Sequence, residues 1–352
     1  MSAPSFQPPR CPNRACPMHR APQPRFFQCC GSYRARCRAD AVPRFRCKHC
    51  RRGFSRQTFR QDYRDRRPEC NGLLFRLLVS GVGLRQAGRW LRLGVHAVQH
   101  KFRKLAHAMR RLDRNLLQEL PPGRRYLLDE LETFEHSSIL PLSVPVLIEH
   151  DSLAVVAAGV APIRRVARIG SRRQRWLSRH EQSHGRRKDR SVRSLRRILG
   201  RLRRRLRGHR AVLVSDQKQV YASLCRGLLR GQVEHERVSG ELPRTTYNPL
   251  FRINLTDAML RDNNGRLRRR SWLVSKTAAC LRRQLALFTA YRNWHRLRTN
   301  REQDELTPGV QLGCVHRRLS VEELLAWRQD WGRRSIHPTS VTGSESIAAM
   351  AA

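Results

Sequence analysis

An apolar stretch that ends in acids constrains this chain more than any other feature. Residues 125–128 read Arg-Tyr-Leu-Leu, and Asp129 and Glu130 follow them directly. A short apolar run of this kind is typical of a buried strand, yet the whole chain of 352 residues has a formal net charge of +45. A strand that delivers carboxylates in so basic a chain predicts a chemical role for Asp129. The alternative is a capping role at the end of the strand.

The charge itself predicts a polyanionic partner. The sequence holds 72 Lys plus Arg against 27 Asp plus Glu, and a compact domain with that charge repels itself unless phosphate neutralises it. We expect double-stranded DNA as the partner. A merely basic protein, such as a ribosome-associated RNA binder, is the alternative that the composition leaves open.

The sequence lacks two kinds of segment that would indicate a location in or across a membrane. No run of about 18 apolar residues predicts a membrane span, and residues 1–10 lack the apolar core of a signal peptide. The cysteines are then expected in a reducing compartment, where metal binding is favoured over disulfides. We expect a cytoplasmic protein with no membrane partner; a bacterial, nucleoid-associated location is implied only by the family resemblance described below.

Two short cysteine pairs predict a zinc ribbon within residues 1–69. Cys11 and Cys16 form one pair, and Cys47 and Cys50 form the other. Together they supply the four sulfurs of a tetrahedral zinc site, and a segment this short and polar needs metal to fold. Four Cys leave no open coordination position, so we expect a structural Zn²⁺ in a docking module for DNA or protein. The alternative ligands are Cys29, Cys30 and Cys37.

Residues 70–118 have the pattern of a helix-turn-helix. A short helix is expected at 84–91 and a longer one at 95–109, joined by a turn that contains Gly94. Val95 and Val98 are expected to pack inward. The residues predicted to contact DNA are Arg85, His96, Gln99, Arg103 and Lys104. Gln99 suits the reading of a base edge and the basic side chains suit phosphate; the alternative is a helical hairpin with a solvated basic face.

Residues 119–300 predict an α/β domain with an Arg-rich insertion near 164–190, which we expect to be a mobile loop. Strands come first, and helices and strands then alternate. The expected strands are 125–130, 144–149, 153–161, 211–215 and 233–238, and the expected helices begin near 192, 218 and 254. This is the order of an RNase H-like domain, in which the first and fourth strands lie side by side.

That order would bring three carboxylates together. Asp129 would leave the first strand and Asp216 the fourth, while Asp257 would arrive from the late helix. Two Mg²⁺ ions can activate a nucleophile and stabilise the leaving oxygen in phosphodiester chemistry, and Mg²⁺ prefers carboxylate and phosphate oxygens. Mn²⁺ would substitute. The alternatives are an N-cap role for Asp216 and a first-turn helix acid for Asp257.

These motifs resemble those of bacterial insertion-sequence transposases of the DDE class. The resemblance spans roughly residues 11–335 and rests on the order ribbon, helix-turn-helix, Asp129, Asp216, Asp257 and Ser275-Lys276. It implies an RNase H-like fold, Mg²⁺ dependence, and transposition by hydrolysis and strand transfer without a covalent enzyme intermediate. The third acid departs from the class, where it is usually Glu.

Basic residues after the third acid predict a DNA clamp. The candidates are Arg268, Arg269, Arg270 and Lys276, with Trp272 as a stacking residue or, alternatively, a core residue. Residues 301–352 are expected to form a helical extension and a disordered tail. Helices are expected at 280–298 and 319–331, the second entered through a capping box of Ser320 and Glu323.

The sequence therefore predicts a transposase that binds element ends and cuts and joins DNA with Mg²⁺. A homodimer or higher oligomer on DNA is expected because two ends must be processed together. The competing class is a non-enzymatic DNA-binding regulator derived from a decayed or domesticated transposase. Loss of the metal-dependent step would separate the two.

Overall fold

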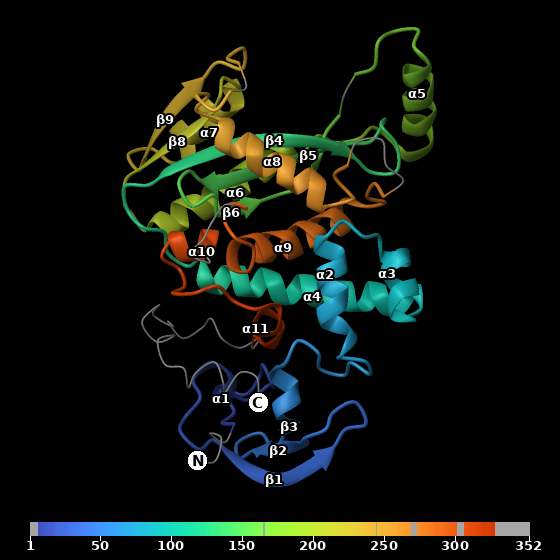
Figure 1. The fold of residues 1–352 in the computed structure, drawn as a ribbon, viewed down its shortest axis with the longest axis vertical. Helices are drawn as coiled ribbons and strands as arrows, with labels where there is room; N and C mark the ends of the chain where they lie inside the picture. The colour runs from blue at the N-terminus through green and yellow to red at the C-terminus, as the bar shows by residue number, and fades with distance from the viewer. Residues whose placement is uncertain (1–5, 165, 244, 269–272, 301–305, 328–352) are drawn as a thin grey trace.

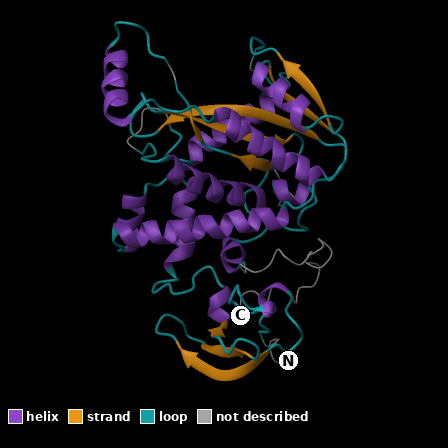
Figure 2. Cartoon of the chain, turned by 180° about the vertical axis from the view of Figure 1, so that it is seen from behind, coloured by secondary structure: helices purple, strands orange, loops and turns teal. Residues whose placement is uncertain are grey.

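The computed structural model describes residues 6–164, 166–243, 245–268, 273–300 and 306–327. It has three tiers: a small N-terminal sheet, a layer of helices, and a large sheet with its own helices (Figure 1). The view from behind shows the same order of sheet, helices and sheet (Figure 2). The predicted mixed α/β class is confirmed.

The N-terminal sheet has strands β1 (Phe27–Arg34), β2 (Ala41–Cys47) and β3 (Gly53–Ser55), paired antiparallel in the order β1-β2-β3. A short helix, α1 (Pro17–Arg20), precedes it, and a 3₁₀ turn, η1 (Arg56–Phe59), follows it. Its apolar core is small, and its largest buried side chains are four phenylalanines, Phe26, Phe45, Phe54 and Phe59. Packing of so small a core contributes little stability, so this module needs a further source of stabilisation.

The helical layer contains α2 (Cys70–Val79), α3 (Leu84–Leu91) and α4 (Val95–Leu116). The start of α4 agrees with the prediction, but α4 runs on to Leu116 instead of ending near 109. The extension has a packing cause: Leu112 is fully buried, and the long helix lies against α9 (Ala278–Trp294). The apolar spacing also continues past 109, through Met109, Leu112 and Leu116, so the sequence pattern and the tertiary contact both favour the longer helix.

The large sheet is mixed. Its strands are β4 (Arg125–Phe134), β5 (Pro141–Glu149), β6 (Val155–Ala158), β8 (Ala211–Asp216) and β9 (Val233–Val238), in the order β6-β5-β4-β8-β9, and β7 (Ala161–Pro162) also pairs with β5. β5 is antiparallel to β4 and to β6, whereas β8 is parallel to both β4 and β9. The first and fourth expected strands are therefore neighbours at the centre.

Helices cover both faces of this sheet. α6 (Ser191–Leu206) and α7 (Gln219–Leu228) share a buried cluster with Leu128, while α8 (Phe251–Asn263) shares another with Leu127 and Leu131. Side chains alternate along a strand, so Asp129 lies on the α8 face and Glu130 on the α7 face. α9 contributes to both clusters and lies between the sheet and α4 (Figure 1).

The Arg-rich insertion is not a plain loop. It contains a helix, α5 (Arg172–His184), which begins at an N-cap where Ser171 Oγ accepts from the amide of Gln174. Only Leu177 is buried in α5, so the helix lacks the apolar stripe that marks a helix in a sequence. The prediction of a structureless segment at 164–190 was therefore wrong for its central part, because a cap rather than a packed face defines the helix.

Two short helices close the described chain, α10 (Pro308–Gln311) and α11 (Val321–Ala326). The capping box at α11 is confirmed: Ser320 and Glu323 exchange backbone and side-chain hydrogen bonds in both directions. The helix predicted at 280–298 is α9 and ends earlier, at Trp294, whereas the part of the predicted helix beyond 327 lies outside the described residues. No helix among the described residues has the length and apolar character needed to cross a membrane.

Candidate metal centres and nucleic-acid surface

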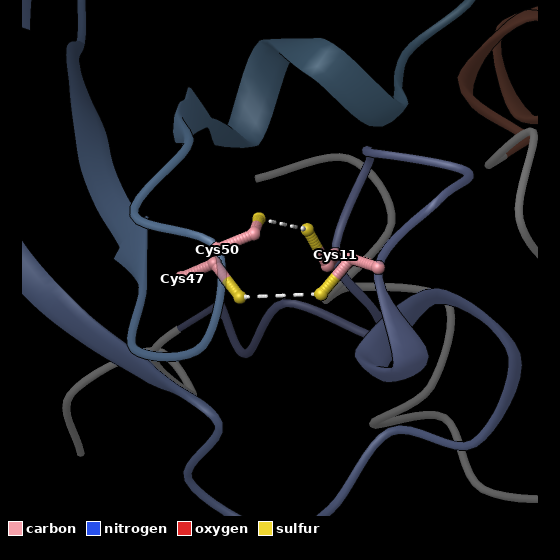
Figure 3. A group of neighbouring side chains, drawn as sticks. Cys11, Cys47 and Cys50 are labelled. Carbon is pink, nitrogen blue, oxygen red and sulfur yellow. Dashed lines mark hydrogen bonds between the residues drawn. The ribbon is translucent and has the colours of Figure 1, made fainter.

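Cys11, Cys16, Cys47 and Cys50 gather at one end of the N-terminal sheet, as predicted, with their sulfurs all within 4.8 Å of one another. The Sγ atoms of Cys11 and Cys50 are 3.5 Å apart, and those of Cys16 and Cys47 are 3.9 Å apart (Figure 3). Four sulfurs at about 2.3 Å from a tetrahedral zinc ion would be about 3.8 Å apart. The four thiols could therefore hold a metal such as zinc.

The backbone around these cysteines is arranged to stabilise negative sulfur. The amide of the residue two positions later donates to the sulfur of Cys11, Cys16 and Cys50. The turn after Cys47 closes with the Arg51 amide donating to the Cys47 carbonyl at 2.9 Å. Amide donors aimed at thiolates are the arrangement that a metal-bound cysteine needs.

The other cysteines of this module do not join the cluster. Cys29 is exposed, while Cys30 and Cys37 are partly exposed. The Sγ atom of Cys37 instead points to the carbonyl of Asp65, at 3.5 Å. The three alternative ligands are therefore not needed to complete the set of four.

Asp129 and Asp216 lie at the centre of the large sheet. The parallel ladder between β4 and β8 ends with Leu128 opposite Ser215, so the next residues on the two strands are Asp129 and Asp216. β4 itself does not end there, contrary to the prediction, because its pairing with β5 continues to Phe134. Asp216 is the last residue of β8, as predicted, whereas Asp129 lies within β4. The two carboxylates thus stand where β4 and β8 separate.

Asp257 comes to this place from α8. It is buried, 5% exposed, on the face of α8 that also buries Ile253, Thr256 and Leu260. Its Oδ1 atom is buried without a hydrogen-bond partner among the described residues. A buried, unsatisfied carboxylate oxygen is rare and needs an explanation.

The electrostatics connect the three acids. Burial raises the pKa of Asp129, and the nearby charge of Asp216 raises it further. Burial also raises the pKa of Asp257, and the charge of Asp129 helps to bring it to about 8. Carboxylates that destabilise one another in this way attract a proton or a cation.

The carboxylates are nevertheless spaced more widely than the thiols. Across the described residues, the four cysteines are the only set of three or more possible ligands whose donor atoms lie within 4.8 Å of one another. The structure therefore brings Asp129, Asp216 and Asp257 into one electrostatic cluster but not into the closed geometry of a preformed metal site.

Comparison with known proteins adds no assignment. No family model matches the chain, and no curated protein sequence matches it. The functional interpretation therefore depends on the geometry of the chain itself.

A polar network supports the carboxylates from the opposite face of the sheet. The Glu130 side chain is largely buried and accepts from Ser143 Oγ, from Tyr221 Oη at 2.9 Å and from Lys218 Nζ at 3.1 Å. This network fixes the central part of β4 and the start of α7, immediately next to Asp129 and Asp216. The sequence did not single out Ser143 or Lys218, because neither belongs to a motif and both reach Glu130 only through the sheet.

The predicted recognition helix presents its first two turns to solvent. The exposed residues of this helix include His96, Gln99 and Arg103, and Arg85 is exposed on the preceding helix, α3. Lys104 is different, since its Nζ donates to the carbonyl of Tyr63 at 2.6 Å. Val95 is 36% exposed and does not pack as expected, because the first turn of α4 projects beyond α3.

The structure describes only two of the four basic residues predicted to form the DNA clamp. Arg268 is exposed and donates to the carbonyl of Asp262 at 2.9 Å, and Lys276 is exposed. Arg269, Arg270 and Trp272 lie outside the described residues.

Proposed function

We propose that this chain is a DDE-class DNA transposase that binds the ends of an insertion sequence and cleaves and joins DNA strands. The observation that carries the proposal is the convergence of Asp129, Asp216 and Asp257 where β4 and β8 separate. Asp129 interacts electrostatically with both Asp216 and Asp257, and three neighbouring acids in a chain with net charge +45 are best explained by a bound cation that faces phosphate.

The sheet supports an RNase H-like assignment. Three antiparallel strands come first, and the parallel strands β8 and β9 continue from the central strand β4. The resemblance places the first two acids on the first and fourth strands and the third on a late helix. β4, β8 and α8 supply them here.

The residues fit a divalent cation. Asp257 Oδ1 lacks a partner among the described residues, and hard cations such as Mg²⁺ take oxygen ligands of this kind. Asp129, Asp216 and Asp257 would hold two Mg²⁺, or Mn²⁺ in their place. Bound there, the metal would supply Lewis-acid stabilisation of the scissile phosphate and of the leaving oxygen.

The chain's own residues would orient the DNA for two in-line displacements. In the first, a water oxygen bonds to phosphorus as the bond to the 3′ oxygen breaks, and the 3′ oxygen takes up a proton. In the second, that 3′-hydroxyl attacks a target phosphodiester, loses its proton, and displaces another 3′ oxygen. Exposed Arg85, Gln99 and Arg103 would bind the element's ends, while Cys11, Cys16, Cys47 and Cys50 would hold a structural Zn²⁺.

A nicking assay tests the proposal. The substrate is a duplex that carries the sequences flanking the gene, with and without Mg²⁺, and the proteins are the wild type and Asp216→Asn. We expect Mg²⁺-dependent nicks that fall by at least about a hundredfold in the variant. Asp262→Asn is the matched control, because the Asp262 side chain is 80% exposed and lies outside the cluster. Equal nicking by both variants would refute a role for Asp216.

The second candidate function is a DNA-binding regulator descended from a transposase. The observation that favours it is the spacing of the carboxylates, which is wider than that of preformed ligands. Such a protein would bind the same duplex with equal affinity in Mg²⁺ and in its absence, and would leave the DNA intact under both conditions.

A further inference from the structure

An arginine stripe runs along the outer face of α6. Its inner face buries Leu195, Ile198, Leu199, Leu202 and Leu206 against the sheet and α7. On the outer face, Arg193, Arg197, Arg201 and Arg204 follow one another at intervals of four, four and three. This spacing puts all four guanidinium groups on one side of the helix.

The stripe borders two hollows that meet. One, of about 640 Å³, is enclosed by α4, α6, α9 and the edge strand β6, and Arg114, Arg201, Arg204 and Arg282 line it. The other, of about 690 Å³, follows the first half of α6 past Arg193, Arg196 and Arg197 and also includes Arg204. Arg204 therefore joins the two hollows into one continuous track.

Arginines outnumber carboxylates along the track, where Asp113 lines the first hollow and Asp189 lines the second. Among the described residues that line the first hollow, Asp113 is the single carboxylate, and it accepts a hydrogen bond from Trp294 Nε1 at 2.7 Å. Burial lowers the pKa of Arg201, and the charges of Arg114 and Arg204 lower it further. Guanidinium groups that repel one another in a concave surface need an anion.

We propose that this track, Arg193 to Arg204 with Arg114 and Arg282, binds the phosphate backbone of a DNA strand. Its length favours a polymer over a small anion. Eleven helical steps of about 1.5 Å give about 16 Å. A duplex lying parallel to α6 carries about five charges per strand over that length, one for each 3.4 Å or so of its axis.

The strand held here is a separate segment from the one at the carboxylates. α6 packs on the sheet face that holds Leu128, whereas α8 and Asp257 pack on the face that holds Leu127. One duplex cannot lie on both faces at the same point of the sheet. DNA binding at the track therefore does not require cleavage at the carboxylates. An experiment can refute the track without refuting the transposase proposal, and the reverse also holds.

Salt titration of DNA binding tests the proposal without catalysis. The full chain binds a duplex of arbitrary sequence in Mg²⁺-free buffer, and the triple variant Arg197→Gln, Arg201→Gln, Arg204→Gln is compared with it. Removing three phosphate contacts should lower the salt slope of log K by about 3 and the affinity by on the order of a hundredfold at 0.1 M salt. The control is Arg203→Gln, Arg226→Gln, Arg230→Gln, which removes the same charge from exposed positions on α6, α7 and the segment after α7 that line neither hollow.

The outcomes are distinct. A slope change confined to the first triple supports the track, whereas equal changes in both triples would show only a diffuse effect of charge and would overturn it. Saturable binding of inorganic pyrophosphate with no difference in DNA affinity would also overturn it, in favour of a small-anion site. If the triple variant misfolds, phenylglyoxal labelling of arginines in the wild-type chain tests the same proposal. Bound DNA should protect Arg197, Arg201 and Arg204 from labelling but leave Arg203 reactive. Equal labelling with and without DNA would count against the proposal.

Discussion

At the scale of single residues, Asp113 is the clearest titrating group outside the carboxylate cluster. Burial raises its pKa to about 7, although the hydrogen bond from Trp294 and the charges of Arg205 and Arg201 act in the opposite direction. Because the folded-state pKa lies above the unfolded value, the folded chain holds more protons between about pH 4 and 7. Stability must then fall as pH rises through that window.

The substitution Asp113→Asn removes this contribution while an amide oxygen still accepts from Trp294. We expect the free energy of unfolding of the wild type to fall relative to the variant by about 1 kcal/mol for each unit from pH 5 to 7. Urea denaturation at several pH values measures it, with Asp262→Asn as an exposed control. Parallel pH profiles for wild type and Asp113→Asn would contradict the assignment.

Asp257 makes a prediction about metal that does not depend on cleavage. Its Oδ1, which has no partner among the described residues, should accept a divalent ion, so Mn²⁺ should bind the wild type and raise its melting temperature by a few degrees. Asp257→Asn should weaken Mn²⁺ binding by at least about tenfold, as read by calorimetry. Unaltered Mn²⁺ affinity in Asp257→Asn would remove this residue from the ligand set and leave Asp129 and Asp216 to be tested.

At the scale of elements, the junction of α3 and α4 depends on a close backbone approach. A Cβ atom at Gly88 would stand 2.8 Å from the carbonyl oxygen of Leu93 and 3.3 Å from a methyl group of Val98. Gly88→Ala should therefore push the two helices apart and cost about 1–3 kcal/mol. Urea denaturation of the full chain measures the loss.

Gly227 provides the matched control for that substitution. It lies in α7, and a methyl group added there would meet no described atom within 4 Å. Gly227→Ala should therefore stabilise the chain by about 0.5–1 kcal/mol through helix propensity. Opposite signs for the two substitutions would support the packing argument. Stabilisation by both substitutions would contradict the close approach at Gly88 and leave only the effect of alanine on helix propensity and on the unfolded state.

The N-terminal sheet makes a second prediction at this scale. With a small apolar core, it should unfold when metal is removed, so a strong chelator should abolish the circular dichroism of this module and release about one zinc per chain. Cys47→Ser should lose the metal, whereas Cys29→Ser, at an exposed position, should retain it. Full metal content in Cys47→Ser would refute the four-cysteine site.

The elements also show what local pattern can and cannot predict. The apolar runs of β5, β8 and the first part of β4 were visible in the sequence because their burial is nearly continuous. The far end of β4 was missed, since Glu132 and Thr133 lack an apolar signal and only pairing with β5 holds them in the strand. α5 was missed for a related reason: its residues are polar, and a cap rather than a packed face starts it.

At the scale of the whole molecule, the sequence could predict the carboxylate cluster but not the arginine track. Asp129, Asp216 and Asp257 each lie in a recognisable element, and strand order alone places two of them together. The track instead combines Arg114, Arg204 and Arg282 from three helices far apart in the chain. No short motif records that arrangement, because it arises only when α4, α6 and α9 pack around β6.

The net charge of +45 predicts that salt stabilises the free protein. Repulsion among the many arginines opposes the compact state, and ions screen it with a Debye length of about 10 Å at 0.1 M salt. The melting temperature should thus rise by several degrees between about 0.05 and 0.5 M KCl, as measured by calorimetry. The rise should be smaller in the Arg197, Arg201, Arg204 triple variant than in the control triple, because clustered charges repel more strongly than scattered ones. A melting temperature that falls with salt would mean that net attraction between acids and arginines stabilises the folded chain. That result would contradict both the repulsion among the arginines of the chain and the excess of positive charge in the track.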